Sequence, residues 1–136
     1  MRRYGRVLDH VDLRASDLEA SRRFYAAALG ALGVEITLDE PHGFGADEFF
    51  VEGADPRPTT GVHLAFQAAD RAAVHRFHEA ALGAGGTDNG PPGPRDFGPG
   101  YYAAFVLDPD GNNVEAVARE GHARSAQAVE LTEAGA

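Results

Sequence analysis

Two histidines, His10 and His63, open two copies of one repeated segment. Residues 10–33 align without a gap to residues 63–86, and twelve of the 24 paired positions are identical. Such self-similarity in a short chain indicates two copies of one supersecondary unit within a single domain. A histidine at the same point of both units can meet its counterpart across a pseudo-two-fold axis. Because neutral imidazole is a common ligand of metal ions, the repeat predicts a metal site.

A glutamate near the end of the chain, Glu115, completes a set of three metal ligands. In residues 6–14, 62–67 and 112–119, aliphatic side chains alternate with polar ones, which is typical of strands with one buried face. The aliphatic faces are expected under two helices, so His10, His63 and Glu115 share the opposite, concave face. Two imidazoles and one carboxylate, with open positions left for substrate, form the facial-triad arrangement around a divalent ion. The same face carries three further polar side chains: Asp12, Gln67 and Asn113.

Each copy of the repeat has the pattern of a strand followed by a helix. Ser16 followed by Glu19 is a capping-box pattern that predicts a helix start, and Gly30 and Gly33 predict its end. In the second copy Asp70 is the expected N-cap, and the helix ends before the glycines within residues 83–86. The apolar stripe at helical spacing in both copies predicts the face that packs on the sheets.

Short strands are predicted after each helix. In the first unit, residues 34–38 and 48–52 have strand patterns and are separated by a loop rich in Pro and Gly. In the second unit, residues 87–100 contain too many prolines and glycines for regular structure, and strands follow at 101–107 and 112–119. The DPDGN segment at 108–112 has the residues of a tight hairpin turn. The predicted fold is α+β: one domain over residues 1–120, with units at about 5–55 and 60–120, a linker at 56–59 and a tail at 121–136.

Composition excludes several classes of protein. Without cysteine, the chain has no disulfide, no zinc-thiolate site and no cysteine nucleophile. All twelve basic residues are arginine, which excludes a Schiff-base lysine and a Walker-A phosphate loop. A net charge of −9 argues against nucleic acid or an anionic membrane as partner. No apolar run approaches the ~20 residues that span a membrane, and no signal-peptide pattern opens the sequence, so a cytoplasmic location is expected.

Three segments resemble the vicinal oxygen chelate superfamily: DHVDLRASDLEASRRFYAAALG, GVHLAF and FVLDPDGNNVEAV. This superfamily includes glyoxalase I, extradiol dioxygenases, methylmalonyl-CoA epimerases, fosfomycin-resistance thiol transferases and bleomycin-resistance proteins. The resemblance extends to about Arg119 and is specific for the fold through the His-led run and the DPDG hairpin. It implies two βαβββ modules that form a curved mixed sheet around a pocket for a metal ion or ligand.

Carried onto this sequence, the resemblance places metal ligands at His10, His63 and Glu115, in agreement with the strand faces. One divalent ion is expected, and Zn, Ni, Co, Mn or Fe(II) would each fit nitrogen and oxygen ligands. Glyoxalase I has a fourth protein ligand, and residues 51–52 align by eye with residues 114–115, which makes Glu52 a candidate for it. If the reaction needs a base, Asp12 or Glu52 would supply it. Family members of this size often form homodimers, so the site can lie within one chain or between two.

Other side chains are expected around the mouth of the pocket. In the long loop of the second unit, Arg95 is a candidate for binding a substrate anion, and Phe97 lies next to it. Tyr102 is expected at the pocket wall. His75 and His78 stand three residues apart on the second helix, where a solvated surface position is expected for both.

Three activities agree with the resemblance. The favoured one is lyase or isomerase chemistry on a small oxygen-bearing substrate, with the metal acting as a Lewis acid that stabilises an enediolate or a similar oxyanion. The second is Fe(II)-dependent dioxygenation of the extradiol type. The third is metal-free binding of a drug, as in bleomycin-resistance proteins, and the acidic charge suits this reading. The complete set of His10, His63 and Glu115 argues against it, because a binding protein has no need of these ligands.

Overall fold

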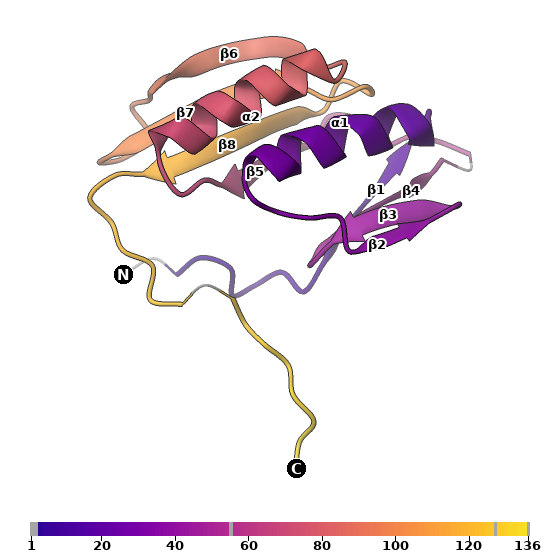
Figure 1. Cartoon of the computed structure of the whole chain (residues 1–136), viewed down its shortest axis with the longest axis horizontal. Coiled ribbons are helices and arrows are strands. Elements are labelled where there is room, and N and C mark those ends of the chain that lie inside the picture. The colour runs from indigo at the N-terminus through magenta and orange to yellow at the C-terminus, as the bar shows by residue number, and fades with distance from the viewer. Residues whose placement is uncertain (1–2, 55, 127, 136) are drawn as a thin grey trace.

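Each copy of the repeat folds as one strand, one helix and three further strands (Figure 1). This computed structural model describes residues 3–54, 56–126 and 128–135. The first unit contains β1 (Val11–Ala15), α1 (Leu18–Ala31), β2 (Leu38–Glu40), β3 (Gly43–Ala46) and β4 (Phe49–Gly53). The second contains β5 (His63–Gln67), α2 (Arg71–Gly83), β6 (Thr87–Pro94), β7 (Tyr101–Leu107) and β8 (Asn113–Arg119). The predicted βαβββ order is therefore confirmed for both units.

The two units form two four-stranded mixed sheets with the same strand order. Sheet A has the order β1-β4-β3-β2 and sheet B the order β5-β8-β7-β6. In both sheets the first strand pairs in parallel with the last, and the other neighbours are antiparallel. The α+β class is confirmed. Within one chain, however, the strands of the two units belong to two sheets and not to one continuous sheet.

Both sheets pack their aliphatic faces on the helices. α1 and α2 lie side by side and contribute to one core shared by the two units (Figure 1). Phe24 and Tyr25 of α1 and Val74 and Phe77 of α2 are completely buried. Because the helices occupy the inner faces, the polar faces of both sheets turn away from the core. No helix in the described parts of the chain has the length and apolar character needed to cross a membrane.

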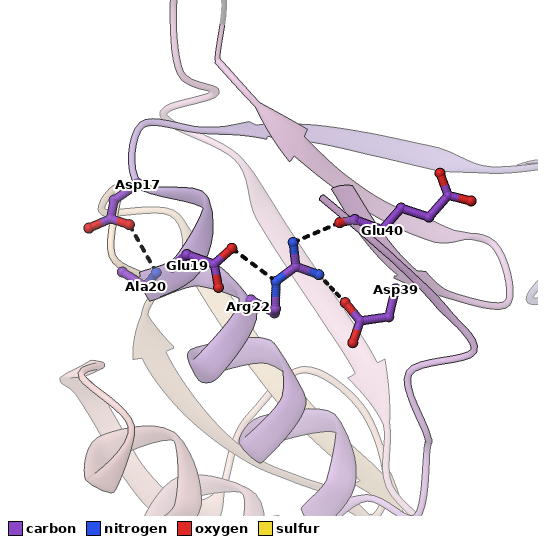
Figure 2. Close-up of polar contacts among 6 residues, drawn as sticks. All are labelled: Asp17, Glu19, Ala20, Arg22, Asp39 and Glu40. Atoms are coloured by element: carbon purple, nitrogen blue, oxygen red, sulfur yellow. Dashed lines mark hydrogen bonds and ion pairs between the residues drawn. The ribbon is translucent and has the colours of Figure 1, made fainter. Parts of the chain in front are cut away.

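The first helix begins one residue later than the capping-box pattern predicts. Asp17 is the N-cap, and its carboxylate accepts a hydrogen bond from the Ala20 N–H at 3.0 Å (Figure 2). Ser16 instead donates its hydroxyl to Asp110 in the second unit. The same motif recurs at Asp70, which is the predicted N-cap of α2. An acidic side chain at this position also suits the positive end of the helix dipole.

Arg22 fixes the edge strand of sheet A to α1. Its guanidinium donates to the Asp39 carboxylate, to the Glu40 carbonyl at 2.9 Å and to Glu19 at 3.3 Å (Figure 2). β2 is only three residues long and its side chains are exposed. The contacts from Arg22 therefore substitute for the packing that so short a strand lacks.

Three strand predictions need correction. The segment 6–10 is not part of β1, which begins at Val11, and Val7 is 82% exposed. The Pro/Gly-rich loop of the first unit contains β3, and residues 34–37 form no strand. The corresponding loop of the second unit contains β6, an edge strand with two register shifts against β7. Prolines are tolerated there, because an edge strand has a free side that needs no N–H donors.

The predicted hairpin turn at residues 108–112 joins the two units. Asp108 is buried, and its Oδ1 accepts hydrogen bonds from the N–H groups of Asp110 and Asn112, both at 2.9 Å. Its Oδ2 accepts from the hydroxyl of Tyr25 on α1 at 2.6 Å. Asn112 donates to the carbonyl of Thr59 in the linker at 2.9 Å. Burial and the neighbouring Asp108 carboxylate raise the pKa of Tyr25 far above its ordinary value, so the phenol stays a donor.

Candidate metal and substrate site

A buried carboxylate in sheet B forms the centre of the site. Glu115 lies on β8 with its side chain only 2% exposed. Its Oε1 is 2.7 Å from Nε2 of His63, the first residue of β5, and its Oε2 accepts a hydrogen bond from the Tyr101 hydroxyl on β7. The His63 side chain is 54% exposed. The site is therefore a fixed carboxylate with one open imidazole in front of it.

Tyr101 holds the carboxylate through a hydrogen bond from its hydroxyl. Burial, followed by the hydrogen bond and the charge of Glu115, raises the pKa of Tyr101 to about 12. The hydroxyl therefore remains a donor near neutral pH. A group that orients a metal-binding carboxylate in this way typically affects metal affinity about 10–100-fold.

Sheet A has a second polar cluster, on the strands equivalent to those of the first. His10 directly precedes β1; its ring lies 6.4 Å from that of Phe50, and its Nδ1 is 2.8 Å from Asp9. Asp12 and Glu52 line a shallow pocket of about 160 Å³ that also contains His42. Burial, then the charge and hydrogen bond of Glu52, raise the pKa of Asp12. The neighbouring Glu52 thus favours the protonated form of Asp12.

The strand register shows that Phe50, and not Glu52, occupies the place equivalent to Glu115. Asp12 pairs with Phe50 in sheet A, whereas Ala65 pairs with Glu115 in sheet B. Asp12 and Ala65 each stand two residues after the repeated histidine. The alignment of residues 51–52 with 114–115 is therefore offset by two positions. Gly45 opposite Phe50 provides the space for that ring, because a Cβ there would collide with it.

The predicted ligands do not all come together within one chain. Glu115 and His63 are in contact, but His10 belongs to sheet A. Over residues 3–54, 56–126 and 128–135, no group of three or more His, Cys, Asp or Glu side chains is placed to hold one metal ion. Each chain thus presents two donors on the polar face of one sheet and the third predicted donor beside the other sheet.

Two of the predicted pocket residues lie on the polar face of sheet B. Asn113 pairs with His63 across the parallel strands and accepts a hydrogen bond from Asn89 Nδ2 at 3.2 Å. Gln67 is exposed at the end of β5. Phe97, which is 65% exposed, packs edge-on against Tyr101 with ring centroids 5.3 Å apart.

Tyr102 does not lie at the wall of the candidate site, against expectation. Tyr102 is buried on the helix face of sheet B, where its hydroxyl lies 2.6 Å from His75 Nε2 and the Arg71 guanidinium covers its ring. His75 is exposed on α2, as expected, and its ring is a hydrogen-bond partner of Tyr102. The side chain of His78 is mostly covered, against expectation, and binds Asp88. Arg95 lies in the expected loop, directly after β6, and its guanidinium donates to backbone carbonyls of that strand. The functional residue that sequence reasoning missed is Tyr101.

Comparison with known proteins agrees with this fold. A family model described as the glyoxalase/bleomycin resistance protein/dioxygenase superfamily matches residues 7–116. An uncharacterised protein of Bacillus subtilis, YqjT, is 34% identical over 128 residues, which cover 82% of this chain and 98% of the relative. The crystal structure of a glyoxalase/bleomycin resistance protein from Albidiferax ferrireducens shares 32% identity and a TM-score of 0.71, covering 81% of this chain and 96% of that one.

A more distant structural likeness concerns the fold alone. A lactoylglutathione lyase from Agrobacterium tumefaciens has a TM-score of 0.58 at 22% identity, with 82% of this chain and 92% of that chain covered. The family match spans most of the sequence, and the resemblance of the three motifs is thereby confirmed. The chain belongs to the glyoxalase/bleomycin resistance protein/dioxygenase superfamily, that is, to the vicinal oxygen chelates.

The donors present fit a divalent transition metal. An imidazole nitrogen and a carboxylate oxygen within 2.7 Å of each other, one exposed and the other buried, form an open half-site. Nitrogen and oxygen ligands of this kind suit Zn, Ni, Co, Mn and Fe(II). The hydrogen bond from Tyr101 to Glu115 supplies the outer-shell partner that metal-binding carboxylates usually have.

Proposed function

We propose that this protein is a divalent-metal-dependent enzyme acting on a small oxygen-bearing substrate, with lyase or isomerase chemistry favoured. The observation that carries the proposal is the buried Glu115, held by Tyr101 and placed against the open imidazole of His63. Metal binding is common in the superfamily to which the chain belongs. When bound, the metal would polarise substrate oxygens as a Lewis acid.

The third ligand, His10, is proposed to come from a second copy of the chain. One chain leaves the polar faces of sheets A and B uncovered by the helices, with His10 beside the first and Glu115 on the second. A two-fold dimer that places sheet A of one protomer against sheet B of its partner would unite the three ligands twice. Homodimers are frequent in the superfamily, and this arrangement gives the dimer a chemical role.

The carboxylate pair of sheet A is proposed to move the proton. Asp12 and Glu52 line the same pocket, and burial together with the neighbouring Glu52 raises the pKa of Asp12. A carboxyl group with a raised pKa is a better proton acceptor once ionised than an ordinary aspartate. We assign Asp12 as the general base and Glu52 as the neighbour that raises its pKa. A role of Glu52 as a fourth metal ligand is the second alternative. In the same dimer this pair would face the half-site of sheet B.

The carboxylate pair predicts a measurable titration. The Asp12 carboxyl should titrate above the ordinary aspartate value, and Glu52→Gln should lower that midpoint, because it removes the neighbouring charge. A raised folded-state pKa means that protonated Asp12 favours the folded state at low pH and that this contribution is lost as pH rises past the folded pKa. Carbon-13 NMR of the carboxyl groups measures both midpoints, with exposed Asp96 as the internal reference. An Asp12 midpoint unaffected by Glu52→Gln would contradict the pairing.

Fe(II)-dependent dioxygenation is the second candidate function. Two imidazoles and one carboxylate are also the ligands of non-haem Fe(II) oxygenases, which leave positions open for dioxygen and substrate. Metal identity separates the alternatives, because dioxygenation needs iron and consumes oxygen. Metal-free drug binding, as in bleomycin-resistance proteins, is the outcome if no metal is bound.

Metal content tests the proposed function. Protein purified without a His tag should carry about one divalent transition metal per chain, since one shared site forms per protomer in a two-fold dimer. His63→Ala and Glu115→Gln should each lose it together with activity, whereas Glu79→Gln on the outer face of α2 should keep it. Elemental analysis gives the readout. Full metal retention in the His10→Ala/His63→Ala double variant would show that the site lies elsewhere.

A further inference from the structure

A pocket of about 420 Å³ lies at the end of β8, next to the metal half-site. Its walls are Tyr4, Phe97, Gly98, Pro99, Arg119 and His122. We propose that this pocket binds a carboxylate group of the substrate, with Arg119 as its anion-binding residue. In an acidic chain with a net charge of −9, such a site depends on local placement of a cation and not on the overall field.

The charge of Arg119 is held in place by aromatic rings. Its guanidinium carbon lies 4.5 Å from the centroid of the Tyr4 ring and 5.1 Å from that of Tyr101. Glu120, the next acidic residue along the chain, forms its ion pair with Arg71. Within the described residues, no carboxylate is in ion-pair distance of Arg119. A planar guanidinium carries its N–H groups at its edge, where they can bind a carboxylate in a bidentate manner.

Backbone hydrogen bonds fix the turn that contributes Phe97, Gly98 and Pro99 to the pocket wall. Gly100 has φ +72°, and a Cβ there would collide with the carbonyl of Glu120. The Glu120 N–H donates to the Gly100 carbonyl at 2.8 Å, and the Tyr101 N–H donates to that of Gly98 at 3.3 Å. These bonds hold the turn that carries Phe97 against the end of β8. The pocket is thus preformed, which reduces the cost of binding.

Arg95, which lies over the Phe105 ring of the same sheet, is already engaged. Its guanidinium donates to the Pro91 carbonyl at 2.6 Å and to the Pro94 carbonyl at 3.2 Å, and it lies 5.5 Å from the Phe105 centroid. These bonds stabilise the irregular edge strand β6. Binding an anion at Arg95 would require breaking them, whereas Arg119 has its polar edge available.

Tyr101 connects the pocket to the metal half-site, because it contacts two residues of the pocket wall and also Glu115. Its ring contacts Arg119 and Phe97, while its hydroxyl donates to Glu115. A substrate with its carboxylate on Arg119 would therefore extend along Tyr101 toward His63 and Glu115. The proposed substrate class is a small carboxylic acid with an apolar or aromatic body that packs against Phe97. Its metal-binding oxygens would be separated from the carboxylate by about the length of a tyrosine side chain, the distance that Tyr101 bridges. This extension toward the metal rests on the proposed function, but the anion site does not.

Benzoate and its neutral analogue benzamide test the anion site. In metal-free protein, NMR titration should show benzoate binding at the signals of Phe97 and Tyr101, and benzamide binding at least about tenfold more weakly, because it lacks the charge-assisted bonds. Arg119→Gln should weaken benzoate by at least about tenfold and leave benzamide unchanged. Arg23→Gln, an exposed change of equal charge on α1, should have no effect.

Two outcomes would overturn the assignment. One is equal binding of benzoate by wild type and Arg119→Gln; the other is a larger loss for Arg95→Gln than for Arg119→Gln. Metal content of Arg119→Gln is measured in parallel and should equal that of wild type. Because the titration uses metal-free protein, absence of a metal site would leave the benzoate result intact, and the two proposals fail separately.

Discussion

Asp108→Ala is expected to lower the free energy of unfolding by about 3–5 kcal/mol, because it leaves several buried donors without an acceptor. The Tyr25 hydroxyl on α1 loses its acceptor, and the N–H groups of Asp110 and Asn112 lose theirs. Tyr25 is fully buried, so water cannot replace the carboxylate. The contact joins α1 of the first unit to the hairpin of the second. Its loss therefore weakens the junction between the units as well as the turn.

Chemical denaturation measures this effect, with two matched variants. Asp108→Asn keeps one acceptor and should cost less than the alanine, and Asp96→Ala in an exposed loop should change stability by no more than about 0.5 kcal/mol. A loss below about 1 kcal/mol for Asp108→Ala, within the range of one ordinary hydrogen bond, would contradict the role of this hairpin as the junction.

The pairing of His63 with Glu115 could be predicted because alternation along a strand fixes which side chains share a face. The repeat identified the two histidines, and Glu115 followed from the polar positions of the last strand. Tyr101 was missed, although its signal was present. In the hairpin of β7 and β8, Phe105 pairs with Glu115 and Tyr101 with Arg119, so odd-numbered residues of both strands share one face. Because the hairpin turn fixes this register, the sequence could have predicted that Tyr101, and not Tyr102, shares a face with Glu115.

Predictions made from residue composition or local sequence similarity were wrong where backbone pairing determines the structure. β6 is rich in proline and glycine, yet it pairs with β7 because an edge strand needs donors on one side only. The sequence similarity of residues 51–52 and 114–115 likewise does not reflect structurally equivalent positions. Register places Phe50 opposite Asp12, and it shows that the first unit lacks a counterpart of Glu115.

The packing of the two units could not be predicted from the repeat. Equivalent positions for His10 and His63 show that the units are alike, but not which faces meet. In the structure, α1 packs on α2, and the polar faces of the two sheets turn away from the shared core. This arrangement separates His10 from Glu115 within a chain, and it is the reason for proposing a site between protomers.

Mixing two defective subunits tests that proposal most directly. His10→Ala and Glu115→Ala homodimers should each bind almost no metal, because every site lacks one ligand. In a mixed dimer, one site combines both defects, whereas the other receives intact His10 from one protomer and intact His63 and Glu115 from its partner. Random pairing makes about half of the dimers mixed, so metal content should return to about one quarter of the wild-type value.

The measurement is elemental analysis after equimolar unfolding, joint refolding and removal of free metal, with each variant refolded alone as the control. Recovery of about one quarter of the wild-type metal, together with activity, is the result predicted for a site shared by His10 of one protomer and Glu115 of its partner. No recovery in the mixture, or full metal content in His10→Ala alone, would contradict the shared site.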